Sequence, residues 1–195
     1  MHSEASVASA VADAYGVVNA VSLYVERANK TFHSVHVRAA ERVANQARRH
    51  GVERLAHVSG IGADAASRSR YIRSRGEGEL AVQAAFPGAT IIRPAVMFGP
   101  DDSFLTVLIQ LLRRLPAYPM FGPGKTRLQP ADVNDVAEAV ARVLLASKTP
   151  PTTYELGGPC IYSYSAEGHC WGQIPGRRRG PSNAITQRRL IGRVT

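Results

Sequence analysis

Short apolar runs alternate with segments of helical periodicity between Tyr15 and Leu156. This alternation is typical of βα units that surround a parallel sheet, so the pattern predicts an α/β fold. We expect strands at residues 16–21, 54–58, 90–92 and 154–156, and helices at residues 31–50, 71–86 and from 132 onward.

The ends of two expected helices carry recognisable signals. Apolar or small residues recur every three or four positions in segment 31–50, and Gly51 follows as a stop signal. Asp132 stands directly before the last helix, where an N-cap is needed. In the helix at 71–86, Gly76 and Gly78 each lower the helix propensity by about 1 kcal/mol relative to alanine.

Segment 104–115 is apolar on almost every side and is followed by Pro116. It is too short to cross a bilayer, so we expect a buried helix, with a surface that faces a partner or rests on a membrane as the alternative. No run of apolar residues in the chain is long enough for a transmembrane helix, and residues 1–4 do not begin a secretory signal.

Length and composition indicate a single core. With 195 residues, 45% of them hydrophobic, the chain can bury one substantial core, and we expect one domain at residues 1–165. Both periodicities stop beyond Ser165. Residues 166–195 hold six arginines against one glutamate, which predicts a disordered basic C-terminal tail.

The net charge of +9 raises the question of a nucleic-acid partner. No aromatic side chains interleave with the arginines of the tail, so a stacking platform is absent and no specific nucleic acid is expected. A basic-tail binding module that holds polyanions weakly, and in a salt-dependent way, remains as an alternative.

The cysteines and histidines do not indicate a stabilising cross-link or a metal. Cys160 and Cys170 are too few for a disulfide framework and indicate free thiols in a reducing compartment. Four histidines lack the spacing of a ligand set, and no metal site is expected from them: His33, His36, His50 and His57.

Two glycine-rich segments resemble phosphate-binding loops only in part. Residues 60–65 read GxGxxA after a strand, but no helix opens at once and Asp64 would place a carboxylate among the phosphates. Residues 122–126 resemble the end of a Walker A loop, yet Pro119 occupies the position of its first glycine. We expect a flexible strand-end loop at the first segment and a tight loop at the second.

Tyr71 and Arg75 are four residues apart, so on a helix they share one face. In a hydride-transfer site a tyrosine hydroxyl exchanges a proton with the substrate oxygen, and a neighbouring cation makes that exchange easier. An arginine supplies the charge but keeps its protons, so it does not replace a lysine in a relay. The alternative is an exposed helix on which Arg75 pairs with Glu79.

Five segments follow one another along the chain, at residues 52–59, 71–75, 93–100, 129–137 and 154–159. In this order they resemble the extended and atypical short-chain dehydrogenase superfamily, which is NAD-dependent epimerase/dehydratase-like. Within it, the chain is most similar to the NAD(P)H-binding accessory subunit of respiratory complex I and its bacterial relatives. The resemblance covers about residues 3–165.

The resemblance implies a Rossmann-like parallel sheet with flanking helices that binds NAD(P)(H) across the carboxyl ends of its strands. It implies a catalytic centre at Tyr71, Arg75 and Ser59, in which Arg75 holds the place of the family's lysine. It also implies that six residues lie along the cofactor: Ala20, Val21, Val58, Pro94, Ala95 and Val96.

The chain departs from the pattern of the family at three points. It begins just before the strand at Gly16, so about two βα units of about 30 residues each, with the Gly-rich loop, are expected to be missing from an incomplete sheet. Such a truncation, or a misread gene product, would impair cofactor binding and leave an apolar sheet edge open to association. Ile61 occupies the place of a substrate-orienting serine, and Arg75 replaces lysine.

These departures favour an NAD(P)-binding protein that is non-catalytic or weakly active and belongs to respiratory complex I or a quinone-linked assembly. The first alternative is an NAD(P)-dependent epimerase, dehydratase or reductase acting on a small or nucleotide-linked alcohol, and the second is the basic-tail module. We expect a protein partner, peripheral membrane association, and a place in the cytoplasm or on the cytoplasmic face of the inner membrane, which is the matrix side in a mitochondrion.

Overall fold

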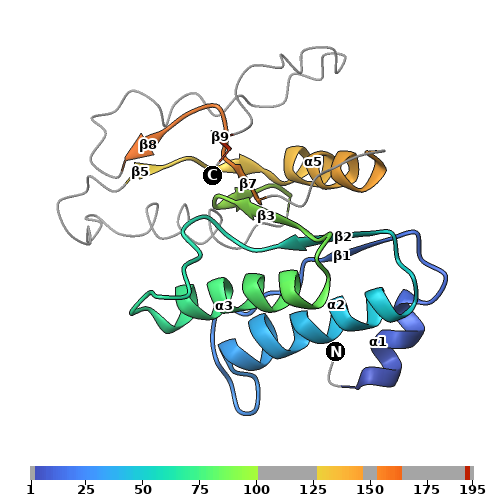
Figure 1. Ribbon diagram of the computed structural model, residues 1–195. Helices are drawn as coiled ribbons and strands as arrows, with labels where there is room; N and C mark the ends of the chain where they lie inside the picture. The colour runs from blue at the N-terminus through green and yellow to red at the C-terminus, as the bar shows by residue number, and fades with distance from the viewer. Residues whose placement is uncertain (1–2, 101–126, 147–152, 164–191, 194–195) are drawn as a thin grey trace.

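A parallel sheet forms the centre of the fold. The computed structural model describes residues 3–100, 127–146, 153–163 and 192–193 (Figure 1). Five strands pair in the order β1-β2-β3-β7-β9, and the first four of them run parallel. Their bounds are Gly16–Asn19 for β1, Arg54–Val58 for β2, Thr90–Pro94 for β3, Thr153–Leu156 for β7 and Gly192–Arg193 for β9.

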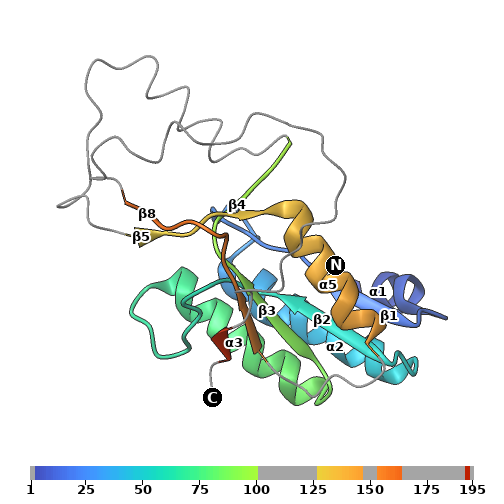
Figure 2. The ribbon, with the colours of Figure 1, turned by 90° about the horizontal axis from the view of Figure 1, so that it is seen from above.

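Helices cover both faces of this sheet. Helices α1, α2 and α3 lie on one face together with the π-helix η1, and α5 lies on the opposite face (Figures 1 and 2). The α/β class predicted from the alternating pattern is therefore confirmed. The bounds are Glu4–Val11 for α1, His33–Ala39 for the π-helix η1, Ala40–Arg49 for α2, Arg70–Ala85 for α3 and Val133–Leu145 for α5.

The core has two parts because side chains alternate between the faces of a strand. Leu55 of β2 packs under α1, α2 and α3 together with Val43, Val82 and Ile91. Its neighbour Ala56 packs under α5 with Ile92, Val136 and Leu156. The apolar stripe predicted for the helix after Asp132 thus buries Val136 and Val140 against the second face.

The predicted helix signals are confirmed. Gly51 adopts a φ of 69°, and the N–H of Val52 donates to the carbonyl of Ala47 at 3.0 Å, which closes α2. Asp132 caps α5, with its Oδ1 accepting from the N–H of Asn134 at 2.8 Å. Ser69 caps α3 in the same way through the N–H of Ile72.

Close packing explains the two glycines inside α3. A Cβ atom on Gly76 would overlap the backbone of Asp64 and Ala65, and one on Gly78 would overlap the carbonyl group of His36. The glycines reduce helix propensity, as expected, but they allow α3 to lie directly against η1 and the loop after β2. This contact fixes the position of the residues at the start of α3.

Two short pairs of strands lie beside the main sheet. Met97–Phe98 (β4) pairs in parallel with Ala131–Asp132 (β6), and Arg127–Leu128 (β5) pairs antiparallel with Tyr162–Ser163 (β8). The first pair holds the segment after β3 against the start of α5. Among the described residues, no helix is long and apolar enough to cross a membrane.

Some details differ from the sequence-based expectations. Helix α1 was not predicted, because only Val7 and Val11 of its small side chains are buried. The first strand ends at Asn19 rather than residue 21. Among the described strands it forms an edge of the sheet, and its Val18 is 43% exposed. The expected helix at 104–115 lies outside the described residues.

The C-terminal segment is described at two residues only. Strand β9 at Gly192–Arg193 pairs antiparallel with β7, and there the structure corrects the expectation that no regular structure follows residue 165. The expected binding role of the basic tail falls on residues outside the described ones.

Candidate functional site

Polar side chains gather where β1 and β2 end. Asn19, the last residue of β1, lies opposite His57 of β2, so both side chains leave the same face of the sheet. The side-chain amide of Asn19 donates to Nδ1 of His57 at 3.2 Å, and its Oδ1 accepts from the N–H of Val21 at 3.3 Å. Both Asn19 and His57 are buried.

Tyr71 lies in the first turn of α3 within a group of aromatic rings. Its ring stacks on Tyr24 with centroids 6.1 Å apart and meets Phe32 edge-on at 5.4 Å and His36 edge-on at 5.6 Å. The partner rings come from the loop after β1 and from η1. This arrangement gives the tyrosine a fixed orientation through contacts with three neighbours.

Arg75 shares a face of α3 with Tyr71, as the spacing predicts. Its guanidinium carbon lies 4.9 Å from the centroid of the Tyr71 ring, and its Nη2 donates to the hydroxyl of Ser22 at 2.6 Å. The residue is only 8% exposed. The alternative of an exposed helix with an Arg75–Glu79 pair is therefore wrong.

Glu79 has a different partner. Its carboxylate accepts from Nη2 of Arg93 at 2.7 Å and from Nε at 3.0 Å, and Nη1 of Arg93 reaches Glu155 at 3.3 Å. The hydrogen bond to Glu79 is the main reason that the pKa of Arg93 is raised. This ion pair ties α3 to β3 and β7.

His36 is held in one neutral form. Its Nε2 accepts from the N–H of Leu23 at 3.0 Å, which leaves the proton on Nδ1. Nδ1 donates to the hydroxyl of Ser74 at 3.0 Å, and that hydroxyl donates to the carbonyl of Tyr71 at 2.9 Å. Burial, and then the charge of Arg75, lower the pKa of His36 to about 4.

His57 is neutral for similar reasons. Burial lowers its pKa to about 4, with smaller contributions from Arg75 and His36. Since Nδ1 accepts from Asn19, the ring proton sits on Nε2. Among the described residues no group of His, Cys, Asp or Glu side chains could hold a metal ion.

Two polar atoms of this region have no hydrogen-bond partner within the described structure. They are Oγ of Ser59 and Nε of Arg75, both buried. The backbone of Ser59 is fixed by its N–H, which donates to the carbonyl of Ile92 at 2.7 Å. A buried polar atom without a partner is uncommon and calls for an explanation.

The other residues expected to lie along the cofactor are spread over the carboxyl edge. Ala20 and Val21 follow β1 and are exposed. Val58 turns its side chain to the opposite face, into the core under α5. Pro94 ends β3, and its carbonyl accepts from the N–H of Ile61 at 3.1 Å.

Ala95 and Val96 continue from β3 and are held by the backbone. The N–H of Ala95 donates to the carbonyl of Leu156 at 2.8 Å, and the carbonyl of Val96 accepts from Ala131 at 3.0 Å. The structure thus joins Tyr71 and Arg75 directly. It places the remaining candidates at the same edge of the sheet, and within the described residues no hydrogen bond joins them to that pair.

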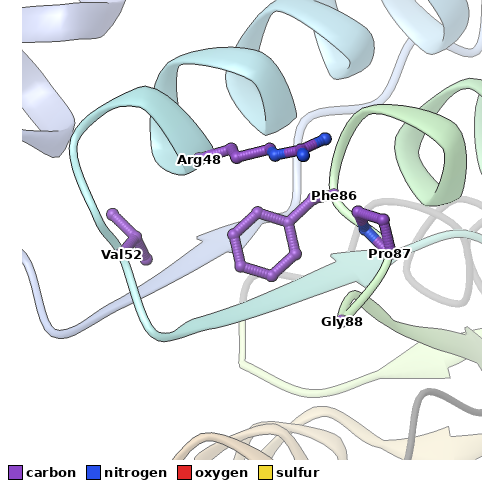
Figure 3. A pocket seen from close by; sticks show the side chains of 5 residues that line it. All are labelled: Arg48, Val52, Phe86, Pro87 and Gly88. Carbon is purple, nitrogen blue, oxygen red and sulfur yellow. The ribbon is translucent and has the colours of Figure 1, made fainter.

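A shallow hollow lies at the opposite edge of the sheet (Figure 3). Arg48, Val52, Phe86, Pro87 and Gly88 line it. These residues precede β2 and β3, whereas ligands of open parallel sheets bind beyond the carboxyl ends of the strands. The hollow is therefore not the candidate site.

Sequence reasoning missed the polar network around Arg75. Its members are Asn19, Ser22, His36, His57 and Ser74. The histidines were considered only as metal ligands. Asn19 ends an apolar run with a polar residue, and this is the one signal in the sequence that could have indicated it.

Sheet order, two helical layers and a polar site at the carboxyl ends define an α/β protein of the Rossmann class. A sequence model of the NAD dependent epimerase/dehydratase family matches residues 4–157. The chain belongs to this family.

Curated relatives include subunits of a respiratory enzyme. The mitochondrial NADH dehydrogenase (ubiquinone) 1 alpha subcomplex subunit 9 of Arabidopsis thaliana is 36% identical over 82% of this chain and 40% of its own length. The NADH-ubiquinone oxidoreductase 40 kDa subunit of Neurospora crassa is 35% identical over 69% of this chain and 35% of its own. A ceramide reductase of Caulobacter vibrioides is 31% identical over 80% of this chain and 47% of its own length. The chain therefore spans less than half the length of these relatives.

Solved structures confirm the fold. A dTDP-4-dehydrorhamnose reductase from Bacillus anthracis in complex with NADP superposes with a TM-score of 0.68 at 16% identity, over 83% of this chain and 63% of that one. MoeE5 in complex with UDP-glucuronic acid and NAD gives a TM-score of 0.67 at 18% identity, over 81% and 61%. At these identities the likeness concerns the fold alone.

Proposed function

We propose that this chain binds NAD(P)(H), has little or no hydride-transfer activity, and serves as an accessory component of an NADH–ubiquinone oxidoreductase or a related quinone-linked assembly. Membership of an NAD-dependent family and relatives named as subunits of that enzyme support the proposal. We place this role in the cytoplasm or at the membrane face that corresponds to the mitochondrial matrix, with peripheral attachment through the protein partner.

The observation that carries the proposal is the state of Arg75. Its guanidinium is held by Ser22 and lies over the face of the Tyr71 ring. Proton transfer during hydride transfer needs a group that can give up and regain a proton beside the phenol, and a guanidinium keeps its protons. Tyr71 can still bind a ligand oxygen, so binding is retained while turnover is lost.

The residues at the carboxyl edge fit the nicotinamide half of a dinucleotide. Ala20, Val21 and residues 94–96 would line it, and Val58 would support it from the core. NAD(P)H bound there would carry a transferable hydride, and the residues of this chain would hold it in position. Among the described residues no glycine-rich turn opens a helix, because α3 begins only at Arg70. We therefore expect weak affinity for the dinucleotide.

Binding and turnover can be measured on the full chain. NADPH is titrated while the nicotinamide fluorescence is followed, and turnover is tested with NAD and UDP-glucose. We expect saturable NADPH binding without turnover in the wild type. No binding of NADPH would contradict the cofactor part of the proposal.

The accessory role has a separate test. The chain is tagged in the organism that encodes it, and solubilised membranes are separated by native electrophoresis. Migration with the NADH–ubiquinone oxidoreductase activity supports the role. A tagged chain that migrates alone contradicts it.

The second candidate is an epimerase, dehydratase or reductase, favoured by the retention of Tyr71 beside a cation. Arg75→Lys tests it with the same substrates. A gain of more than about tenfold in turnover would show that the rest of the reaction centre is intact. Binding without turnover in both forms would exclude the enzyme for those substrates.

A further inference from the structure

Arg75 is a buried cation with few partners. Within the described part of the chain its Nη2 donates to Ser22, and the Tyr71 ring lies beside the guanidinium, but the buried Nε has no hydrogen-bond partner. No carboxylate in the described residues pairs with it. The acid one helical turn away, Glu79, is occupied by Arg93.

A buried charge is costly unless a counter-charge and hydrogen bonds compensate it. The aromatic ring compensates only part of that cost. The neighbouring histidines do not change the net charge of the site, because the positive charge of Arg75 helps to keep His36 and His57 neutral. The site therefore holds one positive charge without an anion among its described neighbours.

Ser59 carries a second buried hydrogen-bond donor. Its hydroxyl has no partner in the described structure, and the residue is 5% exposed. Gly60 follows it and leaves room for the arginine, because a Cβ there would lie 3.4 Å from Nη1 of Arg75. Gly60 therefore lies beside the guanidinium of Arg75, and Ser59 is the residue directly before it.

We propose that Arg75 and Ser59 form a binding site for an oxyanion, which is the carboxylate or phosphate group of a ligand. The guanidinium donates from Nε or Nη1, and the hydroxyl of Ser59 donates from the neighbouring segment. The inference deepens the proposed function. It rests on that function in one respect, which is that a dinucleotide binds next to the oxyanion. Replacement of lysine by arginine then converts a proton-handling position into one that holds an anion.

The test uses the full chain in a buffer of low ionic strength. Inorganic phosphate and acetate are titrated by calorimetry, with chloride as reference anion. The variants are Arg75→Gln and Ser59→Ala. Arg73→Gln is the matched control, because Arg73 lies on the same helix and pairs with Glu77 at the surface.

We expect the wild type to bind phosphate or acetate more tightly than chloride. Arg75→Gln should weaken this binding at least about tenfold and Ser59→Ala about threefold or more. Arg73→Gln should change it less than about twofold. Tighter binding of phosphate assigns a phosphate-bearing ligand, and tighter binding of acetate assigns a carboxylate-bearing one.

Binding that is unchanged in both Arg75→Gln and Ser59→Ala would belong to other basic residues and would overturn the proposal. So would the absence of saturable wild-type binding below about 50 mM of either anion. Circular dichroism checks the fold of each variant. If Arg75→Gln does not fold, Ser59→Ala decides, because the hydroxyl it removes has no partner in the described structure.

The same samples are titrated with NADPH. Anion binding without NADPH binding would contradict the proposed function and leave this inference standing. NADPH binding without anion binding would do the reverse.

Discussion

Arg75 is part of α3, and Arg93 of β3 forms an ion pair with α3, but the surroundings of the two arginines differ. Arg93 extends from β3 and makes hydrogen bonds to two carboxylates, those of Glu79 and Glu155. Arg75 extends from α3 itself and has one hydroxyl and one aromatic ring as partners. The first arginine is fully used in holding elements together. The second keeps donors free, as expected of a group that contacts a ligand.

The largest expected effect comes from breaking the ion pair of Arg93. Glu79→Gln removes the charge of a buried carboxylate and leaves Arg93 with Glu155, which is more exposed. We expect a loss of about 2–3 kcal/mol in the free energy of unfolding, measured with urea. Glu155→Gln is the control and should cost less. Equal costs would show that the two carboxylates contribute alike.

The pH dependence of stability probes the surroundings of Arg75. His36 and His57 have pKa values of about 4 in the folded state, against an ordinary value of 6.5 for a histidine side chain. The unfolded state therefore binds protons first as the pH falls. Stability should be full above about pH 6.5 and should decrease steadily as the pH falls towards 4.

Urea unfolding between pH 7 and pH 4.5, roughly the range in which the two states bind different numbers of protons, measures this loss. In Arg75→Met the loss should be smaller, because the cation no longer opposes protonation of the histidines. An identical pH profile in the variant would contradict the assigned influence of Arg75.

Arg75→Met should change stability by less than about 1 kcal/mol at pH 7, because loss of the Ser22 hydrogen bond is offset by removal of an unpaired buried charge. Arg93→Met is the matched comparison and should cost more. If Arg75→Met is as destabilising as Arg93→Met, Arg75 has a structural role like that of Arg93.

The smallest effect is expected at the surface. Arg73→Gln removes an exposed partner of Glu77 at 3.9 Å and should change the free energy of unfolding by less than about 0.5 kcal/mol. A larger loss, measured by urea unfolding, would show that charge anywhere on α3 matters. The contrast between Arg75 and Arg93 would then lose its meaning.

Local pattern was sufficient for much of the fold. Features that depend on neighbours in sequence were predicted. They are the strands β2, β3 and β7, the end of α2 at Gly51 and the cap of α5 at Asp132. Helix α1 was missed because its few buried side chains give only a faint stripe. The close contact of Gly78 with His36 could not be predicted, because it joins segments about forty residues apart.

The candidate site divides in the same way. Sequence spacing by itself determined that Tyr71 and Arg75 share a face of α3, since the geometry of a helix fixes that relation. The resemblance to the family further implies that Arg75 holds the place where the family's chemistry uses lysine.

Only the tertiary structure decided the partners of each charge. Helix spacing alone allowed Glu79 to pair with Arg75. Because α3 packs on the sheet, Glu79 instead forms an ion pair with Arg93. Packing of η1 and β2 likewise brings His36 and His57 near the guanidinium and excludes water from them. The physical reason is that burial and long-range contacts set the strength of electrostatic interactions, and neither can be derived from spacing along the chain.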